Sequence, residues 1–317
     1  MDVIMSGEAT PSQIGGFITG LRMKGETADE IAGAAAVMRQ KATPIEPTMK
    51  NGDLLIDTCG TGGDSSGTFN ISTASALVAA GAGAIVAKHG NRSISSKCGS
   101  ADVLEALGVN ITIDPADVAR CIETVGIGFL FAPGLHGAMK HAIGPRRELG
   151  IRTIFNILGP LTNPAGARAQ LLGVYDPKLC AVMAEVLKSL GSERAMVVHG
   201  SGLDEISISG STDIAILEDG VVSRRRIVPE DLGIKRAALE DIRGGDADEN
   251  ASIIRDVLSG KPGPRRDVVV VNSAASLIVA GIAKDFKDGI EKASDSIDSG
   301  RAAGKLEELV SFTGGTH

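Results

Sequence analysis

The sequence predicts an α/β fold: a large domain with a mostly parallel central sheet flanked by helices, plus a small all-helical domain. Residues 1–48 read as helices, whereas from Leu54 onward short apolar runs alternate with helical stretches. Such alternation is typical of parallel βαβ units. The 41 Gly residues suit the many tight turns of this fold. Because aromatic residues make up only 3% of the chain, we expect a core of mainly Ala, Val, Ile and Leu.

Two helices are expected in the small domain. The first begins at the segment Thr10–Gln13, whose proline favours a first helical turn. The second begins at Thr27, where Glu30 completes a capping box, and runs to about Gln40. Prolines and a glycine then break the pattern near residue 49, where the large domain is expected to begin.

In the large domain, strands and helices are expected to alternate. The predicted strands are 54–56, 85–87, 128–131, 171–174 and 195–199. The predicted helices between them are 73–81, 100–107, 115–125 and 177–190. A hairpin of 206–217 and 221–227 should follow, and then helices near 248–258, 268–283, 286–299 and 302–310.

One segment, residues 136–164, interrupts this alternation. It carries Lys140, His141, Arg146 and Arg147, and then a turn-rich string from Asn156 to Pro164. We expect it to return to the N-terminal helices, so that the large domain consists of residues 49–135 and 165–317.

Composition limits the class of protein. The net charge of −7 argues against a general nucleic-acid binder, which usually carries a basic face. The four cysteines have no metal-site spacing, and free thiols in a reducing cytoplasm are the simplest interpretation. No signal peptide is visible, and the apolar run Val268–Ile282 is too short for a confident membrane span. We therefore expect a cytoplasmic protein without a membrane partner.

Two glycine-containing loops directly follow predicted strands. Residues 60–64 read GTGGD and lead into an Ala-rich helix, and residues 88–96 read KHGNRSISS. Glycines bring backbone N–H groups close to an anion, while hydroxyls, Lys and Arg add donors and charge. The alternatives are a ligand-free turn for the first loop and simple helix capping for Ser72 and Thr73. Two such loops favour a ligand with more than one phosphate group.

Two charged pairs are further candidates. Asp204 and Glu205 follow a predicted strand end and could hold Mg²⁺, which prefers oxygen ligands and phosphates. Taken alone, such a pair is more often surface, so the interpretation depends on the phosphate loops. Arg146 and Arg147 could bind a carboxylate in a bidentate way, or could pair with Glu148 on a helix surface. The spacing of Arg146 and Arg147 does not decide between carboxylate binding and pairing on a helix surface.

Together, these motifs resemble the anthranilate phosphoribosyltransferase family. The resemblance runs in order through DTCGTGGD (57–64), GTFNISTA (67–74), VAKHGNRSISSKCGSADVLEALG (86–108), RRELGIRTIFNILGPLTNPA (146–165) and VVHGSGLDEIS (197–207). It implies an enzyme of tryptophan biosynthesis that joins anthranilate to 5-phospho-α-D-ribose 1-diphosphate (PRPP) and releases pyrophosphate, using Mg²⁺. It also implies an active site in the hinge cleft between the two domains and a homodimer formed through the helical domain.

The resemblance implies a role for each site residue by position. PRPP would be held by Gly60, Gly63, Asp64, Thr68, Asn70, Ile71, Ser72, Thr73, Lys88, His89, Gly90, Asn91, Arg92, Ser93, Ile94, Ser95, Ser96 and Ser100. Mg²⁺ would be held by Ser72, Asp204 and Glu205. Anthranilate would contact Gly60, Asn91, Arg146 and His136.

The chemistry implied by the resemblance matches these residue types. Departure of pyrophosphate leaves an oxocarbenium-like sugar, and a metal ion with cationic side chains stabilises the leaving charge. The amine of anthranilate is already neutral at physiological pH, so it needs orientation more than a base. We therefore expect that no single residue acts as an indispensable general base. We expect Lys88 and Arg92 to face phosphate and Asn91 to face the amine.

The chain departs from the family pattern in three places. Ser65 stands where Gly is frequent, and is expected to stiffen the first loop. Leu135-His136-Gly137 replaces a usual His-His-Pro near the anthranilate channel. About one opening helix is absent before the MDVIMSGEAT start, from which we expect an uncovered apolar patch on the helical domain and a weakened dimer.

Two rival functions remain open to the sequence. Pyrimidine nucleoside phosphorylases share the fold class but bind inorganic phosphate and a nucleoside without Mg²⁺; the Asp204-Glu205 pair and the KHGNR string oppose this interpretation. A non-catalytic relative that binds nucleic acid is opposed by the charge of −7.

Overall fold

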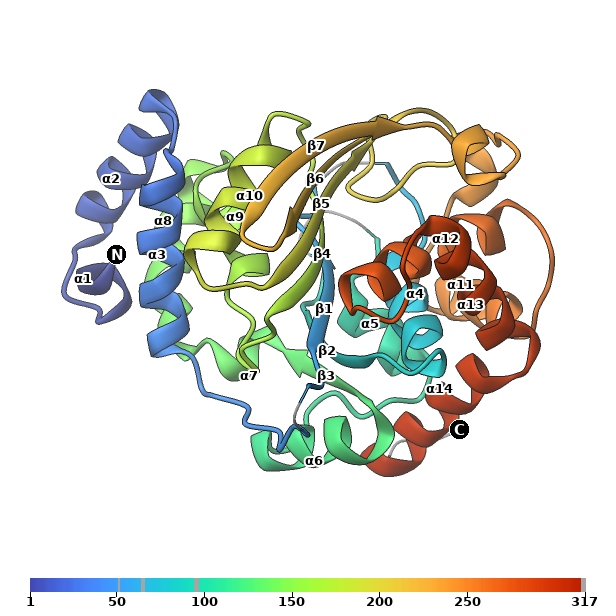
Figure 1. Cartoon of the computed structure of the whole chain (residues 1–317). Helices are drawn as coiled ribbons and strands as arrows, with labels where there is room; N and C mark the ends of the chain where they lie inside the picture. Colours follow the sequence, from blue (N-terminus) through green and yellow to red (C-terminus); the bar gives the residue numbers. More distant parts are fainter. Residues whose placement is uncertain (51, 64–65, 94–96, 315–317) are drawn as a thin grey trace.

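A central sheet organises the molecule. The computed structural model describes residues 1–50, 52–63, 66–93 and 97–314 (Figure 1). Within them the sheet has the strand order β3-β2-β1-β4-β5-β6-β7. The strands are β1 Leu55–Gly60, β2 Ile85–Gly90, β3 Ile127–Phe131, β4 Ala169–Gly173, β5 Arg194–Gly200, β6 Thr212–Glu218 and β7 Val221–Ile227. Strands β1 to β5 pair in parallel, and β6 and β7 join them antiparallel. The predicted mostly parallel sheet is confirmed.

Helices cover both faces of the sheet. They are α1 Asp2–Met5, α2 Pro11–Lys24, α3 Ala28–Lys41, α4 Ile71–Gly81, α5 Ser100–Ala106, α6 Pro115–Val125, α7 Ala132–Leu135, α8 Lys140–Leu149, α9 Phe155–Leu158, α10 Leu179–Ser189, α11 Ala247–Leu258, α12 Pro264–Val279, α13 Phe286–Asp298 and α14 Arg301–Thr313. In Figure 1, α4, α5 and α11–α14 lie on one side of the sheet. Helices α8–α10 lie on the other side, and α1–α3 lie beyond them.

The core is divided by the sheet. The larger apolar cluster packs α4 and α11–α14 against one face, and its side chains are mostly Ala, Val, Ile and Leu, as predicted. A second cluster joins α1–α3 to α10 and to the other face. Helix α4 is buried along almost its whole length because α12, α13 and α14 all pack on it. Its N-terminus therefore has a fixed position at the end of β1.

The N-terminal helices begin where the sequence predicts. Thr10 and Gln13 form a reciprocal capping box at α2, and Thr27 and Glu30 form another at α3. Each box satisfies two backbone N–H groups that a helix start would otherwise leave unpaired. Helix α8 packs against α1 and α2, and α9 packs against α3. The expected return of segment 136–164 to these helices fits these contacts, while the exact domain boundaries stay a prediction.

The predicted hairpin strand 206–217 is wrong in its first half. Only Thr212–Glu218 is strand, and residues 206–211 form a bent loop. The buried side chain of Asn272 on α12 explains the difference, because its Oδ1 accepts the N–H of Ile206 at 2.9 Å and its Nδ2 donates to the carbonyl of Ile206 at 3.0 Å. Backbone groups that a strand would pair are satisfied here by a side chain.

Candidate functional site

The first glycine loop is held to the ends of neighbouring strands. The Thr61 N–H donates to the Gly173 carbonyl at 2.9 Å, and the Gly62 N–H donates to Asp204 Oδ2 at 2.8 Å. Gly62 and Gly63 have φ values of 65° and 74°, a left-handed conformation that favours glycine. The loop is therefore a specific turn whose shape needs these glycines.

Three strand ends carry glycines that seat the segment with the two carboxylates. Gly60 and Gly173 are register partners on β1 and β4, and a Cβ on either would overlap Asp204. A Cβ on Gly200, at the end of β5, would meet the Glu205 carbonyl and Ser207. Bare Cα atoms thus let the segment lie directly on the edge of the sheet. Sequence reasoning missed this role of both glycines, although Gly173 lies in the predicted strand 171–174 and Gly200 directly follows the predicted strand 195–199.

Helix α4 begins beside the first loop. Asn70 is its N-cap residue but makes no capping hydrogen bond; its side chain instead bonds to the Cys98 carbonyl and to Asn250. Ser72 and Thr73 do not cap the helix either, so the capping alternative is not what the structure shows. Thr73 Oγ1 is buried without a hydrogen-bond partner among the described residues. The N–H groups of Ile71 and Thr73 donate to the carbonyls of Phe69 and Asn70, so it is mainly the dipole of this helix start that favours an anion.

Lys88 is the buried cation of the site. Its Nζ donates to the Thr58 carbonyl on β1 at 2.6 Å and to Ser72 Oγ on α4 at 3.3 Å, which links the second loop to both elements. Burial lowers the pKa of Lys88, while Asp57 and Glu205 oppose that shift. Burial likewise raises the pKa of the fully buried Asp57, whose Oδ1 accepts the His89 N–H at 3.1 Å. The charges of the site thus compensate one another at close range.

His89 and His136 form a buried pair. Their Nε2 atoms lie 3.1 Å apart, so one must donate and the other accept. Burial lowers the pKa of His89 to about 3, with His136 adding to the shift, and burial lowers the pKa of His136 to about 4. Both rings are therefore neutral at physiological pH. A pair held this way is a poor general base, while the absence of an indispensable general base stays a prediction.

The pair predicts a pH dependence of stability. In the unfolded chain both histidines titrate near 6.5, but their folded pKa values are about 3 and about 4. Between these limits the unfolded state binds more protons, so stability is full above pH 6.5 and falls as the pH decreases toward 4. We expect a loss of up to roughly 1.4 kcal/mol per pH unit for each histidine. Urea unfolding across this range measures it.

The matched control for this prediction is the double variant His89→Asn, His136→Asn. It removes both rings together, so that no single buried histidine is left without its partner. Its free energy of unfolding should depend less steeply on pH than that of the unchanged chain. Equal slopes for both proteins would show that other groups cause the acid loss.

Arg92 does not face the first loop. Its guanidinium pairs with Asp102 at 3.1 Å and with Glu105 on α5, and lies 5.5 Å from the centre of the Phe131 ring. Asn91 Oδ1 accepts the Arg92 N–H at 2.7 Å, and the Asn91 carbonyl accepts Ser100 Oγ at 3.3 Å. The expectation that Arg92 faces phosphate is therefore not met in this structure, and its binding of PRPP stays a prediction.

Most of the remaining predicted site residues lie in the part of the chain that the structure describes. Thr68 bridges to Arg243, and the N–H groups of Ser93 and Gly99 donate to Asp102 at 3.0 and 2.8 Å. Arg146, on α8, stacks 5.0 Å from the centre of the Phe155 ring, and burial lowers its pKa. Asp64, Ser65, Ile94, Ser95 and Ser96 lie outside the described residues.

Arg152 and Tyr175, two residues that the sequence did not single out, form hydrogen bonds with the first loop. Arg152 Nη2 donates to the Gly63 carbonyl, and its guanidinium lies 4.3 Å from the centre of the Tyr175 ring. The Tyr175 N–H donates to Thr61 Oγ1 at 3.1 Å. We call this set, Thr61, Gly63, Arg152 and Tyr175, the loop clamp. Only the place of Arg152 within the string RRELGIRT could have drawn attention to it.

The oxygen donors of the site fit a divalent cation such as Mg²⁺. Asp204 and Glu205 come from one seated segment, and Ser72 begins α4 beside Lys88. Carboxylate and hydroxyl oxygens are hard ligands that leave room for waters and phosphate. Among the described residues no group of three or more His, Cys, Asp or Glu side chains could hold a metal by itself, so a bound phosphate would have to supply further ligands.

Comparison with known proteins identifies the family. Residues 52–303 match the family described as "Glycosyl transferase family, a/b domain", and residues 1–42 match its "helical bundle domain". The anthranilate phosphoribosyltransferase of Thioalkalivibrio sulfidiphilus is 60% identical over 314 residues, which cover 99% of this chain and 92% of that protein. The chain belongs to the anthranilate phosphoribosyltransferase family.

Solved structures agree. The crystal structure of anthranilate phosphoribosyltransferase from Thermus thermophilus matches with a TM-score of 0.94 and 44% identity, covering 98% of this chain and 93% of that one. The Saccharomyces cerevisiae anthranilate phosphoribosyltransferase in complex with PRPP and Mg matches with a TM-score of 0.87 and 31% identity, covering 96% and 85%. The resemblance and the two-domain fold class drawn from sequence are confirmed.

Proposed function

We propose that the chain transfers the phosphoribosyl group of PRPP to the amine of anthranilate, giving N-(5-phosphoribosyl)anthranilate and pyrophosphate in tryptophan biosynthesis. The observation that carries this is the seating of Asp204 and Glu205 on the glycine ends of β1, β4 and β5, beside the first loop and the start of α4. The yeast relative was solved with PRPP and Mg, ligands that suit such a site.

The diphosphate of PRPP would lie against the first loop and the N-terminus of α4. Gly60, Gly62 and Gly63 permit close approach, and the dipole at the start of α4 favours negative charge. Lys88 supplies a buried positive charge that reaches Ser72. Ser72, Asp204 and Glu205 would hold Mg²⁺, which supplies neutralisation of the leaving pyrophosphate.

Anthranilate would lie between the second loop and α8. Arg146 offers a guanidinium for its carboxylate, and Asn91 and His136 offer polar groups for its amine. Because His89 and His136 are held neutral, these groups orient the amine and do not need to remove its proton before attack.

One assay tests the proposal directly. The fluorescence of anthranilate should disappear with time when the purified chain, PRPP and Mg²⁺ are all present, and should persist when either PRPP or Mg²⁺ is left out. A folded protein that consumes no anthranilate under these conditions contradicts the proposal. Phosphorolysis of thymidine or uridine without Mg²⁺ would instead support the nucleoside phosphorylase alternative.

The role of Arg146 gives a second prediction. Arg146→Gln should raise the KM for anthranilate by roughly 10- to 100-fold while changing the KM for PRPP little, because a charge-assisted contact to one substrate is lost. Arg147 is the matched control, since it is the exposed neighbour on the same helix. Equal effects of Arg146→Gln and Arg147→Gln on steady-state kinetics would refute the assignment.

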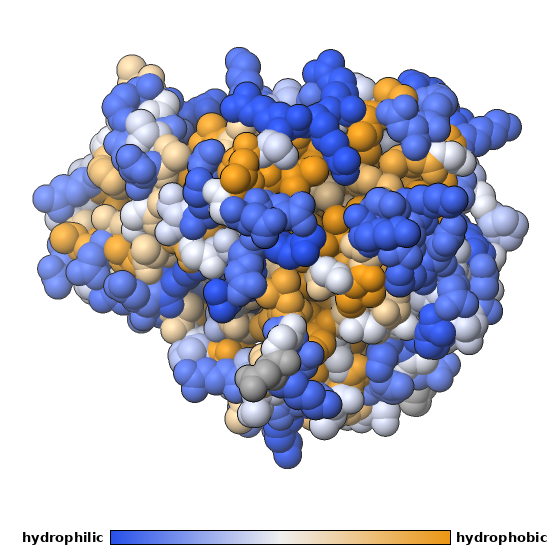
Figure 2. All heavy atoms as spheres, in the orientation of Figure 1, coloured by the Kyte–Doolittle hydropathy of each residue, from blue (hydrophilic) through white to orange (hydrophobic). Residues whose placement is uncertain are grey.

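We further propose a cytoplasmic homodimer formed through the helical domain. Val3 on α1 and Phe17 and Met23 on α2 are 54%, 44% and 83% exposed. Figure 2 shows apolar atoms among hydrophilic ones over this domain, at the left of the view. No helix in the described part of the chain is long and apolar enough to cross a membrane. An exposed apolar surface of this kind suits a second copy of the chain.

Sedimentation velocity over a concentration series tests for the dimer. Phe17→Asp should shift the protein toward monomer, because a charge would replace an apolar contact. Val221→Asp, on the opposite edge strand β7, is the control and should leave the distribution unchanged. A protein that stays monomeric at every concentration of the series would contradict the proposed dimer.

A further inference from the structure

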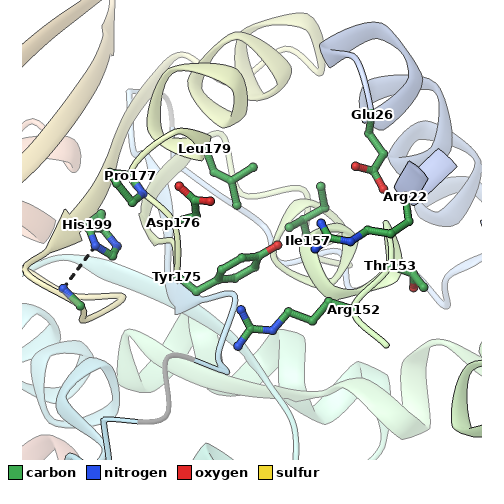
Figure 3. Close-up of a pocket in the computed structure, with 11 residues that line it drawn as sticks. Arg22, Glu26, Arg152, Thr153, Ile157, Tyr175, Asp176, Pro177, Leu179 and His199 are labelled. Carbon is green, nitrogen blue, oxygen red and sulfur yellow. Dashed lines mark hydrogen bonds between the residues drawn. The ribbon is translucent and has the colours of Figure 1, made fainter. Parts of the chain in front are cut away.

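A cavity of about 490 Å³ lies between α2 and the C-terminal ends of β4 and β5 (Figure 3). Its volume is within the range of roughly 300–1,000 Å³ that is usual for small-molecule sites. The polar lining residues are Arg22, Glu26, Arg152, Thr153, Tyr175, Asp176 and His199, and Ile157, Pro177, Leu179 and Gly202 complete the lining. None of the residues assigned above to PRPP, Mg²⁺ or anthranilate lines this cavity, although Arg152 and Tyr175 of the loop clamp do.

Charges of both signs surround Tyr175 in this cavity. Burial raises the pKa of Tyr175; Arg152 and Arg22 oppose the shift, and Glu26 and Asp176 add to it. In Figure 3 the Tyr175 hydroxyl points toward Arg22 and Ile157, while the Arg152 guanidinium lies under the ring. Two positive and two negative groups give a lining without net charge. Such a lining suits a molecule that carries one charge of each sign better than it suits a phosphate.

Several of these groups have unused hydrogen-bonding capacity. Thr153 is only 5% exposed, and its Oγ1 has no hydrogen-bond partner among the described residues. No hydrogen bond or ion pair joins the side chain of Arg22 or Glu26 to any residue that the structure describes, whereas their neighbours Lys24 and Glu30 pair at 2.6 Å. A buried hydroxyl without a partner costs free energy unless a water or ligand satisfies it.

We propose that this cavity binds an α-amino acid in its zwitterionic form, with an apolar or aromatic side chain. Arg22 holds the carboxylate, Glu26 holds the ammonium group, and Thr153 Oγ1 bonds to one of these polar ends. The side chain packs against Ile157 and the Tyr175 ring. This site goes beyond the proposed reaction, and its binding step does not depend on that reaction.

Binding of the amino acid in this cavity would affect the PRPP site through the loop clamp. Arg152 and Tyr175 line the cavity and also hold Gly63 and Thr61. The carboxylate that Arg22 holds also attracts Arg152, which lines the same cavity; as a stronger acceptor than the Gly63 carbonyl it competes for the Arg152 N–H and loosens the loop. The ligand therefore raises the KM for PRPP more than it lowers kcat. This second step rests on the proposed function.

Calorimetric titration of the full chain without substrates tests the binding step. L-phenylalanine should bind, whereas 2-phenylethylamine, which lacks the carboxylate, and 3-phenylpropionate, which lacks the ammonium group, should bind at least about 10-fold more weakly. Equal binding of 3-phenylpropionate would overturn the zwitterion assignment. Failure of L-phenylalanine, L-leucine and L-tryptophan to bind at millimolar concentration would overturn the site.

Variants locate the site. Arg22→Gln and Glu26→Gln should each weaken binding of L-phenylalanine by about 10-fold or more, since each removes one charged partner. Lys24→Gln is the matched control, because Lys24 lies on the same turn but pairs with Glu30 outside the cavity. An equal loss with Lys24→Gln would refute the location. Kinetics with and without the amino acid test the coupling, and an unchanged KM for PRPP would refute it while leaving the binding result intact.

Discussion

Gly173→Ala is expected to lower kcat/KM for PRPP by roughly 100-fold, equivalent to about 2.7 kcal/mol of transition-state stabilisation. The added Cβ would overlap the backbone of Asp204, so the segment with Asp204 and Glu205 must move away from the end of β4. Asp204 and Glu205, two of the three proposed Mg²⁺ ligands, would move together, and their carboxylate oxygens would move away from the first loop. Steady-state kinetics at several Mg²⁺ concentrations should show a raised requirement for Mg²⁺.

The control for this variant separates a local shift from a general effect of replacing glycine. Gly304→Ala adds the same methyl group to α14, where nothing lies within 4 Å of the new Cβ. It should leave kinetics unchanged. A direct titration of Mg²⁺ with PRPP present gives a readout that does not depend on turnover. If Gly173→Ala bound Mg²⁺ as well as the unchanged chain, the seating argument would fail.

Loss of the loop clamp is expected to act on PRPP binding. Arg152→Ala should raise the KM for PRPP by about 10-fold, because the Gly63 carbonyl loses its donor and the left-handed turn at Gly62 and Gly63 loses its support. The KM for anthranilate should change little, since Arg152 lies near the first loop and stacks on Tyr175. Initial rates with each substrate varied in turn measure both constants.

Tyr175 provides a matched pair of variants for the clamp. Tyr175→Leu removes the ring on which the Arg152 guanidinium stacks. It should raise the KM for PRPP by a few-fold, since a cation–π contact contributes about 0.5–2 kcal/mol. Tyr175→Phe keeps the ring and the backbone N–H to Thr61, and should keep the KM close to that of the unchanged chain. Identical values for the two variants would show that the stacking does not support the loop.

Much of the fold was predictable because local signals and burial agree. Capping boxes at Thr10 and Thr27 start α2 and α3 as expected, and each predicted strand before residue 200 overlaps an observed strand. The loop at residues 206–211 was not predictable, because its backbone is satisfied by Asn272, a residue far along the chain. A local pattern does not contain that kind of partner.

The site residues likewise divide into those that the sequence could predict and those that it could not. Glycine loops and paired carboxylates marked where phosphate and metal chemistry could occur, since such ligands need these residue types in short segments. The loop clamp stayed invisible because it joins Gly63 to Arg152 and Thr61 to Tyr175 across roughly a hundred residues of chain. The direction of Arg92 was also beyond local reasoning, because the carboxylates that hold it lie one helix later, on α5.

The contact between α2 and α8 has a consequence for the order in which the molecule assembles. Ile14, Ile18 and Leu21 on α2 share a buried cluster with Ala142 on α8 and with residues of α9. During synthesis these α2 side chains therefore have no complete partner surface until the chain has been made as far as α9. Although its first helices are translated first, the helical domain can be completed only after three strands of the sheet have emerged.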